Sequence, residues 1–325
     1  MHTRLNQVLG IEHPVMLAGM GGVAYSELTA AVSEAGGFGC LGAATMSTEE
    51  MVQEIRAVKA RTSRPFGVDL LTAMPADLPE KVERIIEEGA KVFVAGLGVP
   101  ASVIELCHSH GLLVANLCGK VDHARRAVDA GCDLVVAQGT EAGGHVGRVA
   151  TMALVPAVVD AVGAQVPVVA AGGIADGRGL ASALCLGADG VWVGTRFVAT
   201  PEGRAVPGFK EGILGARDDA TTVTRGYTGK TMRVIANAYT AWWDDHPDQV
   251  VPFPGQVLRS MNDGAFHLGG DEHAEGIDPS RECFPAGQDV GIIHDLIPAA
   301  DVVHGMVRGA EEILHRLQRV LPAHA

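Results

Sequence analysis

The amino-acid sequence predicts a (β/α)8 barrel with a smaller domain inserted near its carboxyl end. Eight short apolar runs alternate with helical patterns over residues 14–195. The runs are nearly continuous in hydrophobicity, as expected of parallel strands that are covered on both faces. Glycine-rich turns follow the sixth, seventh and eighth runs, whereas an open doubly wound sheet usually has its phosphate loop after the first strand. These observations favour the barrel over the open sheet.

The eight expected strands are short and apolar, which is typical of strands in the wall of a barrel. In chain order they read PVMLA (14–18), FGCLGA (38–43), PFGVDL (65–70), KVFVAG (91–96), LLVANL (112–117), DLVVAQ (133–138), VPVVAAGG (166–173) and GVWVGT (190–195).

Helical patterns fill the intervals between these runs. In YSELTAAVSEAGG, Leu28 and Val32 share an apolar stripe, and we expect Ser26 to cap the helix. STEEMVQEIRAVKAR begins with a capping box at Ser47 or the next residue, ahead of Glu50. The remaining helical patterns read LPEKVERIIEEGA, PASVIELCHSHG, VDHARRAVDAGC, MALVPAVVDAVGA and DGRGLASALCLGA.

The alternation of strands and helices ends near residue 204. Residues 205–290 contain no clean βα unit, only a short β pattern around TTVTRGY, and their second half is rich in Pro, Gly and Asp. The final segment, PAADVVHGMVRGAEEILHRLQRV, is a clear amphipathic helix. We therefore expect residues 1–204 and 291–325 to form the barrel, and residues 205–290 to form a lid or insertion domain.

Composition and charge exclude several classes of partner. The formal net charge is −13, whereas binding to nucleic acids or anionic membranes requires a basic surface. No apolar stretch reaches the roughly 18 residues of a membrane span, and the first residues lack the apolar core of a signal peptide. The six cysteines show no CxxC pair and no metal-ligand spacing. We expect a cytoplasmic enzyme that acts on a small molecule without a metal ion; a homodimer is compatible with the sequence.

Two glycine-rich turns are candidates for a phosphate site. VVAAGGIADGRG places Gly172 and Gly173 after the seventh strand, and VWVGTRF places Gly194 and Thr195 after the eighth. Exposed backbone N–H groups and a helix N-terminus favour an anion, and these two loops commonly bind phosphate in such barrels. One such turn alone would be an ordinary βα connection. Two adjacent turns predict phosphate binding.

Three further segments belong to the same rim of the predicted barrel. MLAGMGG puts Gly19 and Gly21 after the first strand, where a planar ligand can approach the backbone closely. GVDLL puts Asp69 at the end of the third strand, where its carboxylate either accepts a hydrogen bond from a ligand or forms a local loop bond. AQGTEAGGHVG follows the sixth strand and carries Gln138 and His145.

His145 is the candidate catalytic residue. Gly143, Gly144 and Gly147 leave its imidazole little hindered, and a histidine can act as base, acid or hydrogen-bond donor near neutral pH. The chain has 13 histidines, most of them in helical patterns, so the alternative is a loop histidine without a role. The position at a strand end and the glycine neighbours favour catalysis.

As a set, these segments resemble the nitronate monooxygenase family, formerly called 2-nitropropane dioxygenases. The resemblance rests on HPVMLAGMGGVAYSELTAAVSEAGGFGCLGA, PFGVDL, AQGTEAGGHVG, VVAAGGIADGRG and GVWVGTRF, and it continues weakly in VTRGYTGKTMRVIANAY and PAGQDVGIIHDLIPAADVV. It implies an FMN-dependent TIM barrel with a smaller added domain, in which His145 is the active-site histidine.

The resemblance also implies which residues contact FMN. By this resemblance the isoalloxazine lies against Gly19 and Met20, and the other contacts come from Gln138, Gly143, Gly172, Gly173, Trp192, Val193, Gly194 and Thr195. Their positions on the same rim add Gly21, Gly144 and Asp69 to this set. Asp69 departs from the family pattern, which usually has asparagine there, and an anion at this position would disfavour reduced anionic flavin.

The function implied by the resemblance is the oxidation of alkyl nitronates with O2, with His145 as base or substrate-orienting group. The alternative function, found among related enzymes, is that of an NADH-dependent reductase or of a desaturase. Its substrate would be an enoyl- or acyl-CoA thioester or a quinone, and NAD(P)H would bind transiently as reductant. A flavin- or phosphate-binding protein without turnover and a nonredox barrel, such as a phosphosugar isomerase, belong to different classes. The presence of bound FMN separates the flavin enzymes from the nonredox barrel.

Overall fold

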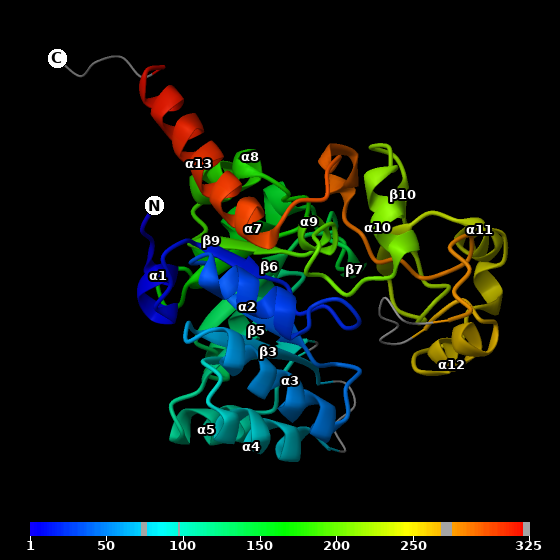
Figure 1. Cartoon of the computed structure of the whole chain (residues 1–325), viewed down its shortest axis with the longest axis horizontal. Helices are drawn as coiled ribbons and strands as arrows, with labels where there is room; N and C mark the ends of the chain where they lie inside the picture. The colour runs from blue at the N-terminus through cyan, green and yellow to red at the C-terminus, as the bar shows by residue number, and fades with distance from the viewer. Residues whose placement is uncertain (73–76, 97, 268–274, 321–325) are drawn as a thin grey trace.

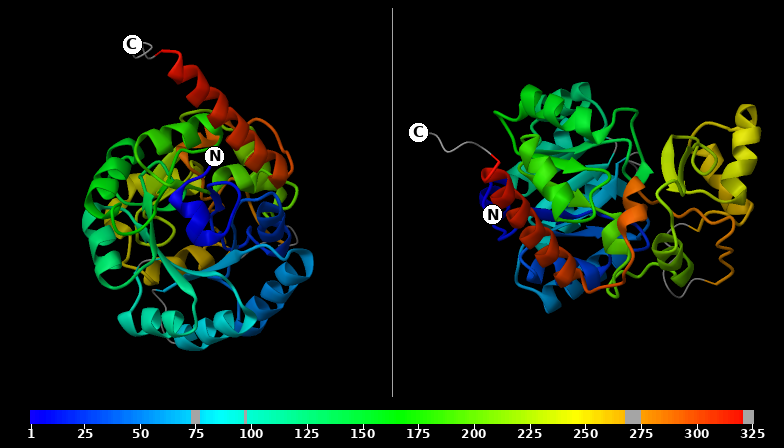
Figure 2. Two further views of the ribbon diagram at one scale, coloured as in Figure 1. Left: turned by 90° about the vertical axis from the view of Figure 1, so that its left-hand side faces the viewer. Right: turned by 90° about the horizontal axis from the view of Figure 1, so that it is seen from above.

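The computed structural model describes residues 1–72, 77–96, 98–267 and 275–320. Eight parallel strands form one sheet in the order β1-β9-β8-β6-β5-β4-β3-β2, and a bridge between Met16 and Phe38 brings its two ends together. The helices surround this closed sheet, as the view along the barrel in Figure 2 shows. The fold is a (β/α)8 barrel, as predicted.

Each barrel strand overlaps one of the eight predicted apolar runs. The strands are β1 (Val15–Leu17), β2 (Gly39–Gly42), β3 (Phe66–Leu71), β4 (Val92–Gly96), β5 (Leu113–Cys118), β6 (Leu134–Gln138), β8 (Val168–Ala171) and β9 (Gly190–Val193).

The helix α1 (Arg4–Leu9) covers one end of the barrel (Figure 2), and its Leu5 and Leu9 belong to the cluster inside the barrel. The other helices pack on the outside of the strands (Figure 1). They are α2 (Ser26–Glu34), α3 (Thr48–Arg61), α4 (Leu78–Glu88), α5 (Ala101–Ser109), α6 (Val121–Asp129), α7 (Thr151–Val162), α8 (Gly177–Cys185), α9 (Thr195–Val198) and α13 (Ala299–Gln318). The last of them, α13, packs against α8 and α2 and so completes the ring of helices. None of the described helices is both long and apolar enough to cross a membrane.

The strands are apolar on both faces because each face meets a different part of the core. Along β6, Leu134 and Val136 belong to the cluster that fills the inside of the barrel. The alternate residues Val135 and Ala137 belong to the cluster between the strands and the helices. Successive side chains of a strand point to opposite faces, so a strand covered on both sides needs an unbroken apolar run.

One of the two predicted helix caps is wrong. Ser47 caps α3 as predicted and accepts a hydrogen bond from the Glu50 N–H at 3.1 Å. Ser26, in contrast, is the first residue of α2, and its hydroxyl has no hydrogen-bond partner in the described part of the chain. The Glu54 carboxylate of α3 accepts the Ser26 N–H at 2.9 Å instead. A carboxylate at a helix N-terminus is favourable whether it is local or distant, and a distant one leaves no local sequence pattern.

The segment after α9 first continues the barrel and then forms a second core. In α10 (Pro207–Leu214), Phe209 stacks on Phe284 with ring centroids 4.9 Å apart, and both rings belong to the barrel core. A separate cluster contains Tyr227, Tyr239, Trp243 and other apolar residues. It is enclosed by β10 (Thr221–Thr224), β11 (Met232–Ile235), α11 (Ala238–Asp245) and α12 (Gly255–Asn262).

We therefore propose that the inserted domain comprises residues 221–283, a narrower segment than the residues 205–290 expected from the sequence. This domain stands beside the barrel in Figure 1 and Figure 2. It is joined to the barrel by a small antiparallel sheet, in which β11 lies between β10 and β7 (Gly144–His145). The two-residue strand β7 belongs to a segment expected from the sequence to be a loop.

Candidate functional site

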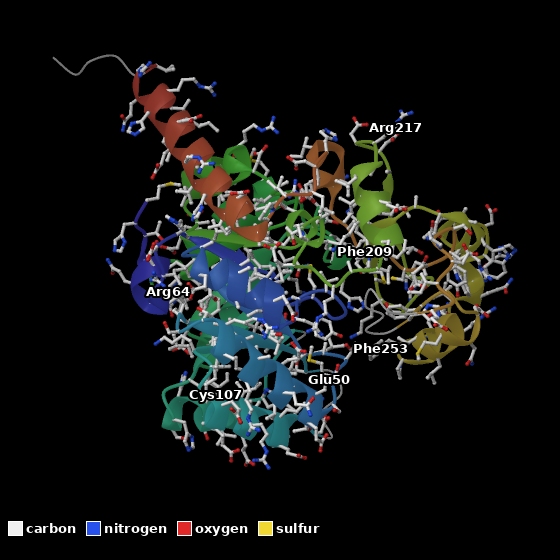
Figure 3. All side chains as sticks on the ribbon, viewed as in Figure 1. Glu50, Arg64, Cys107, Phe209, Arg217 and Phe253 are labelled. Carbon is white, nitrogen blue, oxygen red and sulfur yellow. The ribbon has the colours of Figure 1, made fainter. Side chains whose placement is uncertain are left out.

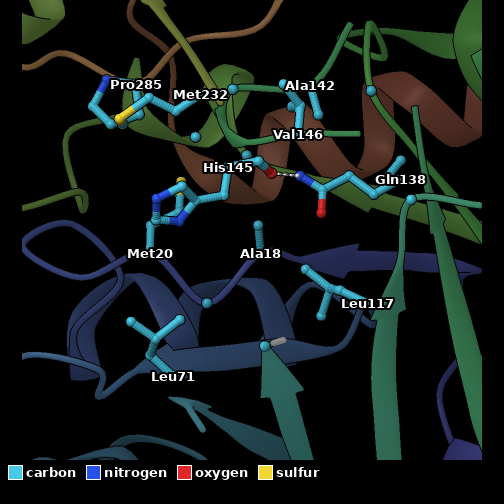
Figure 4. Close-up of a pocket in the computed structure, with 18 of the residues that line it drawn as sticks. Ala18, Met20, Leu71, Leu117, Gln138, Ala142, His145, Val146, Met232 and Pro285 are labelled. Carbon is cyan, nitrogen blue, oxygen red and sulfur yellow. Dashed lines mark hydrogen bonds between the residues drawn. The ribbon is translucent and has the colours of Figure 1, made fainter. Parts of the chain in front are cut away.

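A pocket of about 1310 Å³ lies at the carboxyl ends of the barrel strands, between the barrel and the inserted domain (Figure 4). It collects nearly all of the site residues predicted from the sequence. Those that line it are Gly19, Met20, Gly21, Asp69, Gln138, Gly143, Gly144, His145, Gly172, Gly173, Trp192, Gly194 and Thr195. Val193 is the exception, because its buried side chain belongs to the core cluster between strands and helices. Only its main chain is therefore left for a ligand contact.

The loops after β1, β2 and β3 interlock at one side of this pocket. A methyl group added at Gly19 would overlap the Cβ of Asp69, and one added at Gly42 would overlap the main chain of Met20. The main chain at Gly19 and Met20 is thus held against both neighbouring loops. Gly42 was missed by the sequence analysis, because it belongs to a predicted strand and its importance comes from a contact with another loop.

Asp69 differs from the anion expected from the sequence. It is half-buried at the pocket wall, and no described residue forms a hydrogen bond or an ion pair with its carboxyl group. Burial raises the pKa of Asp69 well above its usual range. Burial therefore favours the neutral carboxylic acid over the carboxylate at this position. A neutral carboxylic acid has one donor and one acceptor oxygen, as the amide of asparagine has a donor and an acceptor.

Because burial raises the pKa of Asp69, replacing it by asparagine is expected to change the midpoint potential of the bound flavin less at low pH, where the carboxyl group is protonated, than at high pH, where it is ionised. The two potentials should separate as the pH rises, with the wild type becoming the lower. Dye equilibration over a series of pH values measures this gap. A gap that does not change with pH would contradict the prediction.

The two predicted phosphate turns lie next to each other in the pocket. Gly172 and Gly173 have φ angles of 111° and 72°, which side chains rarely adopt. A Cβ at Gly172 would also lie 2.8 Å from the Thr151 Oγ1. The Glu141 carboxylate fixes Thr151, accepting bonds from its N–H and its hydroxyl, each at 2.6 Å. Glu141 therefore orders the turn.

Thr195 connects the second phosphate turn to the chain that returns from the inserted domain. Its Oγ1 accepts a hydrogen bond from the Gly287 N–H at 2.9 Å, and its side chain also bonds Asp289. Burial raises the pKa of Asp289 to about 6. Asp289 lines the pocket but was missed, although it lies in the segment PAGQDVG, which carries part of the weak family resemblance. The Thr195 hydroxyl thus forms hydrogen bonds with this segment as well as lying at the second phosphate turn.

These turns fit the phosphate and ring of a flavin mononucleotide. The main chain of the turns at Gly172, Gly173 and Gly194 lines the pocket near the short helix α9. Because glycines have no side chain, these turns leave room for a ligand in the pocket. Space also remains at Gly144, where an added Cβ would meet no atom within 4 Å. The pocket has more than enough volume for a flavin, since ligand sites usually measure about 300–1,000 Å³.

His145 is held by contacts with both parts of the protein. It pairs with Met232 in the sheet that joins β7 to β11. Its carbonyl oxygen accepts a hydrogen bond from the Gln138 side chain at 3.1 Å, which Figure 4 shows as a dashed line. Its Nε2 lies 2.9 Å from the Thr228 Oγ1 of the inserted domain. The ring is therefore fixed in position, which excludes a freely rotating loop histidine.

The ring of His145 is neutral at neutral pH. Burial, and to a lesser degree the positive charge of Lys230, lower its pKa to about 4. Its Nε2 faces Thr228, and its Nδ1 has no hydrogen-bond partner among the described residues. A neutral imidazole with one free nitrogen can accept a proton, whereas it cannot pair as a cation with an anionic substrate. The geometry therefore favours a base over a cationic anchor.

The sequence analysis missed the residues of the inserted domain that hold this loop. The nearly buried Arg233 donates from Nε to the Thr140 carbonyl oxygen at 2.9 Å and from Nη1 to the Thr221 Oγ1 at 3.2 Å. Thr228 and Met232 also line the pocket. The only signal was the weak resemblance in VTRGYTGKTMRVIANAY, because the inserted domain lacks the βα periodicity by which strand ends are recognised.

Comparisons with known proteins agree with this architecture. The family model described as nitronate monooxygenase matches residues 2–80 and 73–309. Over 72% of its length, the chain is 44% identical to a (3aS,4S,5R,7aS)-5-hydroxy-7a-methyl-1-oxo-octahydro-1H-indene-4-carboxyl-CoA dehydrogenase from Mycobacterium tuberculosis. This match spans 66% of that relative, slightly less than two thirds.

Two solved structures match nearly the whole chain. FabK from Thermotoga maritima is 33% identical with a TM-score of 0.88, and the match covers 99% of this chain and 100% of that chain. A nitroalkane oxidase from Streptomyces ansochromogenes is 28% identical with a TM-score of 0.83, and the match covers 96% of this chain and 99% of that chain. The inserted domain is therefore included in both similarities.

Proposed function

Because this chain belongs to the nitronate monooxygenase family and is an oxidoreductase of the flavin type, we propose that it binds FMN and oxidises alkyl nitronates with O2. The observation that carries the proposal is the position of His145. It lines the pocket together with the candidate flavin turns, and it is fixed, neutral and free at Nδ1. The nitroalkane oxidase from Streptomyces supports the same substrate class.

In this proposal the chain's own residues bind and orient the reactants. The turns at Gly172, Gly173 and Gly194 hold the FMN phosphate, and the main chain at Gly19 and Met20 supports the isoalloxazine ring. FMN held there would supply the redox chemistry between the substrate and O2. The protein provides the position of the substrate and the path of its proton.

His145 is the group that handles the proton. The Thr228 Oγ1 fixes its Nε2, so the proton of a neutral nitroalkane or another carbon acid moves from the substrate carbon to Nδ1. With a preformed nitronate no proton need be removed, and the same nitrogen orients the substrate.

The second candidate function is the oxidation or the reduction of a CoA thioester. For the reduction, NAD(P)H would be the reductant. The size of the pocket favours it, since about 1310 Å³ exceeds the usual volume for a small-molecule ligand. The relative at 44% identity is a carboxyl-CoA dehydrogenase. In this chemistry the neutral His145 would act on the acidic C–H bond beside the thioester carbonyl.

Purification and anaerobic reduction test these functions. We expect a yellow protein that releases FMN on denaturation and whose flavin absorbance is bleached by propyl-2-nitronate without O2. Bleaching by NADH or by an acyl-CoA, but not by the nitronate, would instead establish the second candidate. A colourless protein that fails to bind added FMN would refute the flavin proposal.

A further inference from the structure

The mouth of the pocket carries a cluster of positive side chains, although the chain has a net charge of −13. None of them forms an ion pair with a carboxylate among the described residues. The members of this cationic cluster are Lys120, Arg126, Arg148, Arg225 and Lys230. Arg126 and Arg225 donate to main-chain carbonyl oxygens, and the Lys230 Nζ lies 4.3 Å from the centroid of the Phe253 ring, so these contacts do not neutralise the charges. In an acidic protein, cations without a carboxylate partner that line one pocket indicate an anionic ligand.

Backbone contacts bring three of these side chains to one place. A Cβ added at Gly119 would lie 3.3 Å from the Cα of Gly147, so the residues that follow them, Lys120 and Arg148, leave from adjoining loops. The N–H of Val146 donates to the Thr231 carbonyl oxygen at 3.1 Å. Lys230 precedes that threonine in the inserted domain. The cationic cluster therefore spans the junction of barrel and inserted domain.

The positive charges of these side chains contribute to the lowered pKa values of two histidines. After burial, the charges of Lys120 and Arg126 are the next causes that lower the pKa of His123, which the nearby Asp122 only partly opposes. Lys230 likewise contributes to the low pKa of His145. Members of the cationic cluster therefore lie close enough to both histidines to oppose their protonation.

The described carboxyl groups of the pocket do not neutralise this charge. Asp69 is half-buried, and burial raises its pKa, which favours the neutral carboxylic acid. Glu282 is engaged by the His267 Nδ1 at 2.6 Å. Asp289 lies buried beside Thr195 at the phosphate turns. The cationic cluster is left to bind an anion from outside the protein.

We propose that the cationic cluster is a subsite for the phosphate groups of an adenosine pyrophosphate tail, carried by a coenzyme A thioester or by NAD(P)H. Lysine and arginine bind phosphate oxygens through charge-assisted hydrogen bonds, and several of them spread over two loops suit an extended polyphosphate. The tail lies across the mouth while the reactive end reaches His145. A small nitronate at the reaction centre would leave this subsite unused. The inference rests on the proposed flavin site and extends it to the second candidate's substrates.

The test compares two double variants of the FMN-loaded protein. Lys120→Ala/Arg148→Ala removes two members of the cluster. Lys91→Ala/Arg217→Ala removes the same two charges away from the pocket: Lys91 precedes β4 at the other end of the barrel, and Arg217 is exposed after α10 (Figure 3). Titration calorimetry with coenzyme A and with NADPH gives the Kd values at low and at moderate salt.

We expect the pocket variant to bind at least one of the two ligands about tenfold or more weakly than the wild type, with a smaller salt dependence and an unchanged FMN content. The control variant should bind like the wild type. Weakening for coenzyme A alone assigns the subsite to the substrate, and weakening for NADPH alone assigns it to the reductant. Failure of the wild type to bind either ligand, or equal weakening in both variants, would overturn the inference. FMN content is measured separately, so a failure of the flavin proposal is recognised independently.

Discussion

Replacing His145 by alanine is expected to lower kcat by about 10²- to 10⁴-fold while FMN stays bound, which is the usual effect of removing a general base or acid. The loss follows from the position of the ring, whose Nε2 is held by Thr228 and whose Nδ1 is free toward the pocket. Steady-state kinetics with a nitroalkane, together with the flavin absorbance of the purified variant, measure the two effects. The matched control is His123→Ala, which removes a second pocket histidine, on α6. Full kcat in the His145 variant would remove its assigned role.

The low pKa of His145 also affects the pH dependence of folding. With a folded-state pKa of about 4 against an ordinary value of 6.5, the unfolded chain binds more protons between these two values. The free energy of unfolding therefore contains a contribution that is complete above about pH 6.5 and is lost as the pH falls toward 4. Denaturant titrations should show a steeper loss over this range for the wild type than for His145→Gln.

Replacing Gly19 by alanine is expected to lower the melting temperature and to abolish FMN retention. The added methyl group would overlap the Cβ of Asp69, a short side chain that cannot turn away, so one of the two loops must move. Overpacking of this kind costs about 1–3 kcal/mol, and the moved main chain is the proposed support of the flavin ring. Thermal unfolding and the ratio of flavin to protein absorbance measure the two effects.

A double-mutant cycle identifies the cause of that loss. Asp69→Gly removes the overlapping Cβ, so Gly19→Ala should cost less in the Asp69→Gly background than in the wild type. The control is Gly305→Ala in α13, where the added methyl group meets no atom within 4 Å and alanine favours the helix. Additive effects of Gly19→Ala and Asp69→Gly would show that their contact is not the source of the loss.

The barrel could be predicted from the sequence because its signals are local. Each strand is an apolar run that is covered on both faces, and Leu134 to Ala137 show how every residue of such a run enters one of two cores. The glycine turns at Gly172 and Gly194 could be assigned to the pocket from their strand ends alone. The chain order of a barrel places all strand ends on one rim, so local patterns were sufficient there.

The remaining features depend on contacts between residues far apart in the chain. Thr228 meets His145 across 83 residues, and Arg233 meets Thr140 across 93. No local pattern marks these partners. The raised pKa of Asp69 follows from the burial of its carboxyl group. Its residue type alone predicts an anion, which is why the sequence analysis expected one.

The short pairing of β7 with β11 has a consequence for how such enzymes diversify. His145 belongs to the same small sheet as Met232 and Arg233, so the inserted domain builds part of the proposed reaction centre. The inserted domain cannot be replaced by one from another protein without consequence, because the replacement would move His145 together with the residues that contact the substrate. New specificities in this architecture must therefore arise by gradual change within the insertion, and selection on catalysis restrains how far its β11 edge can drift.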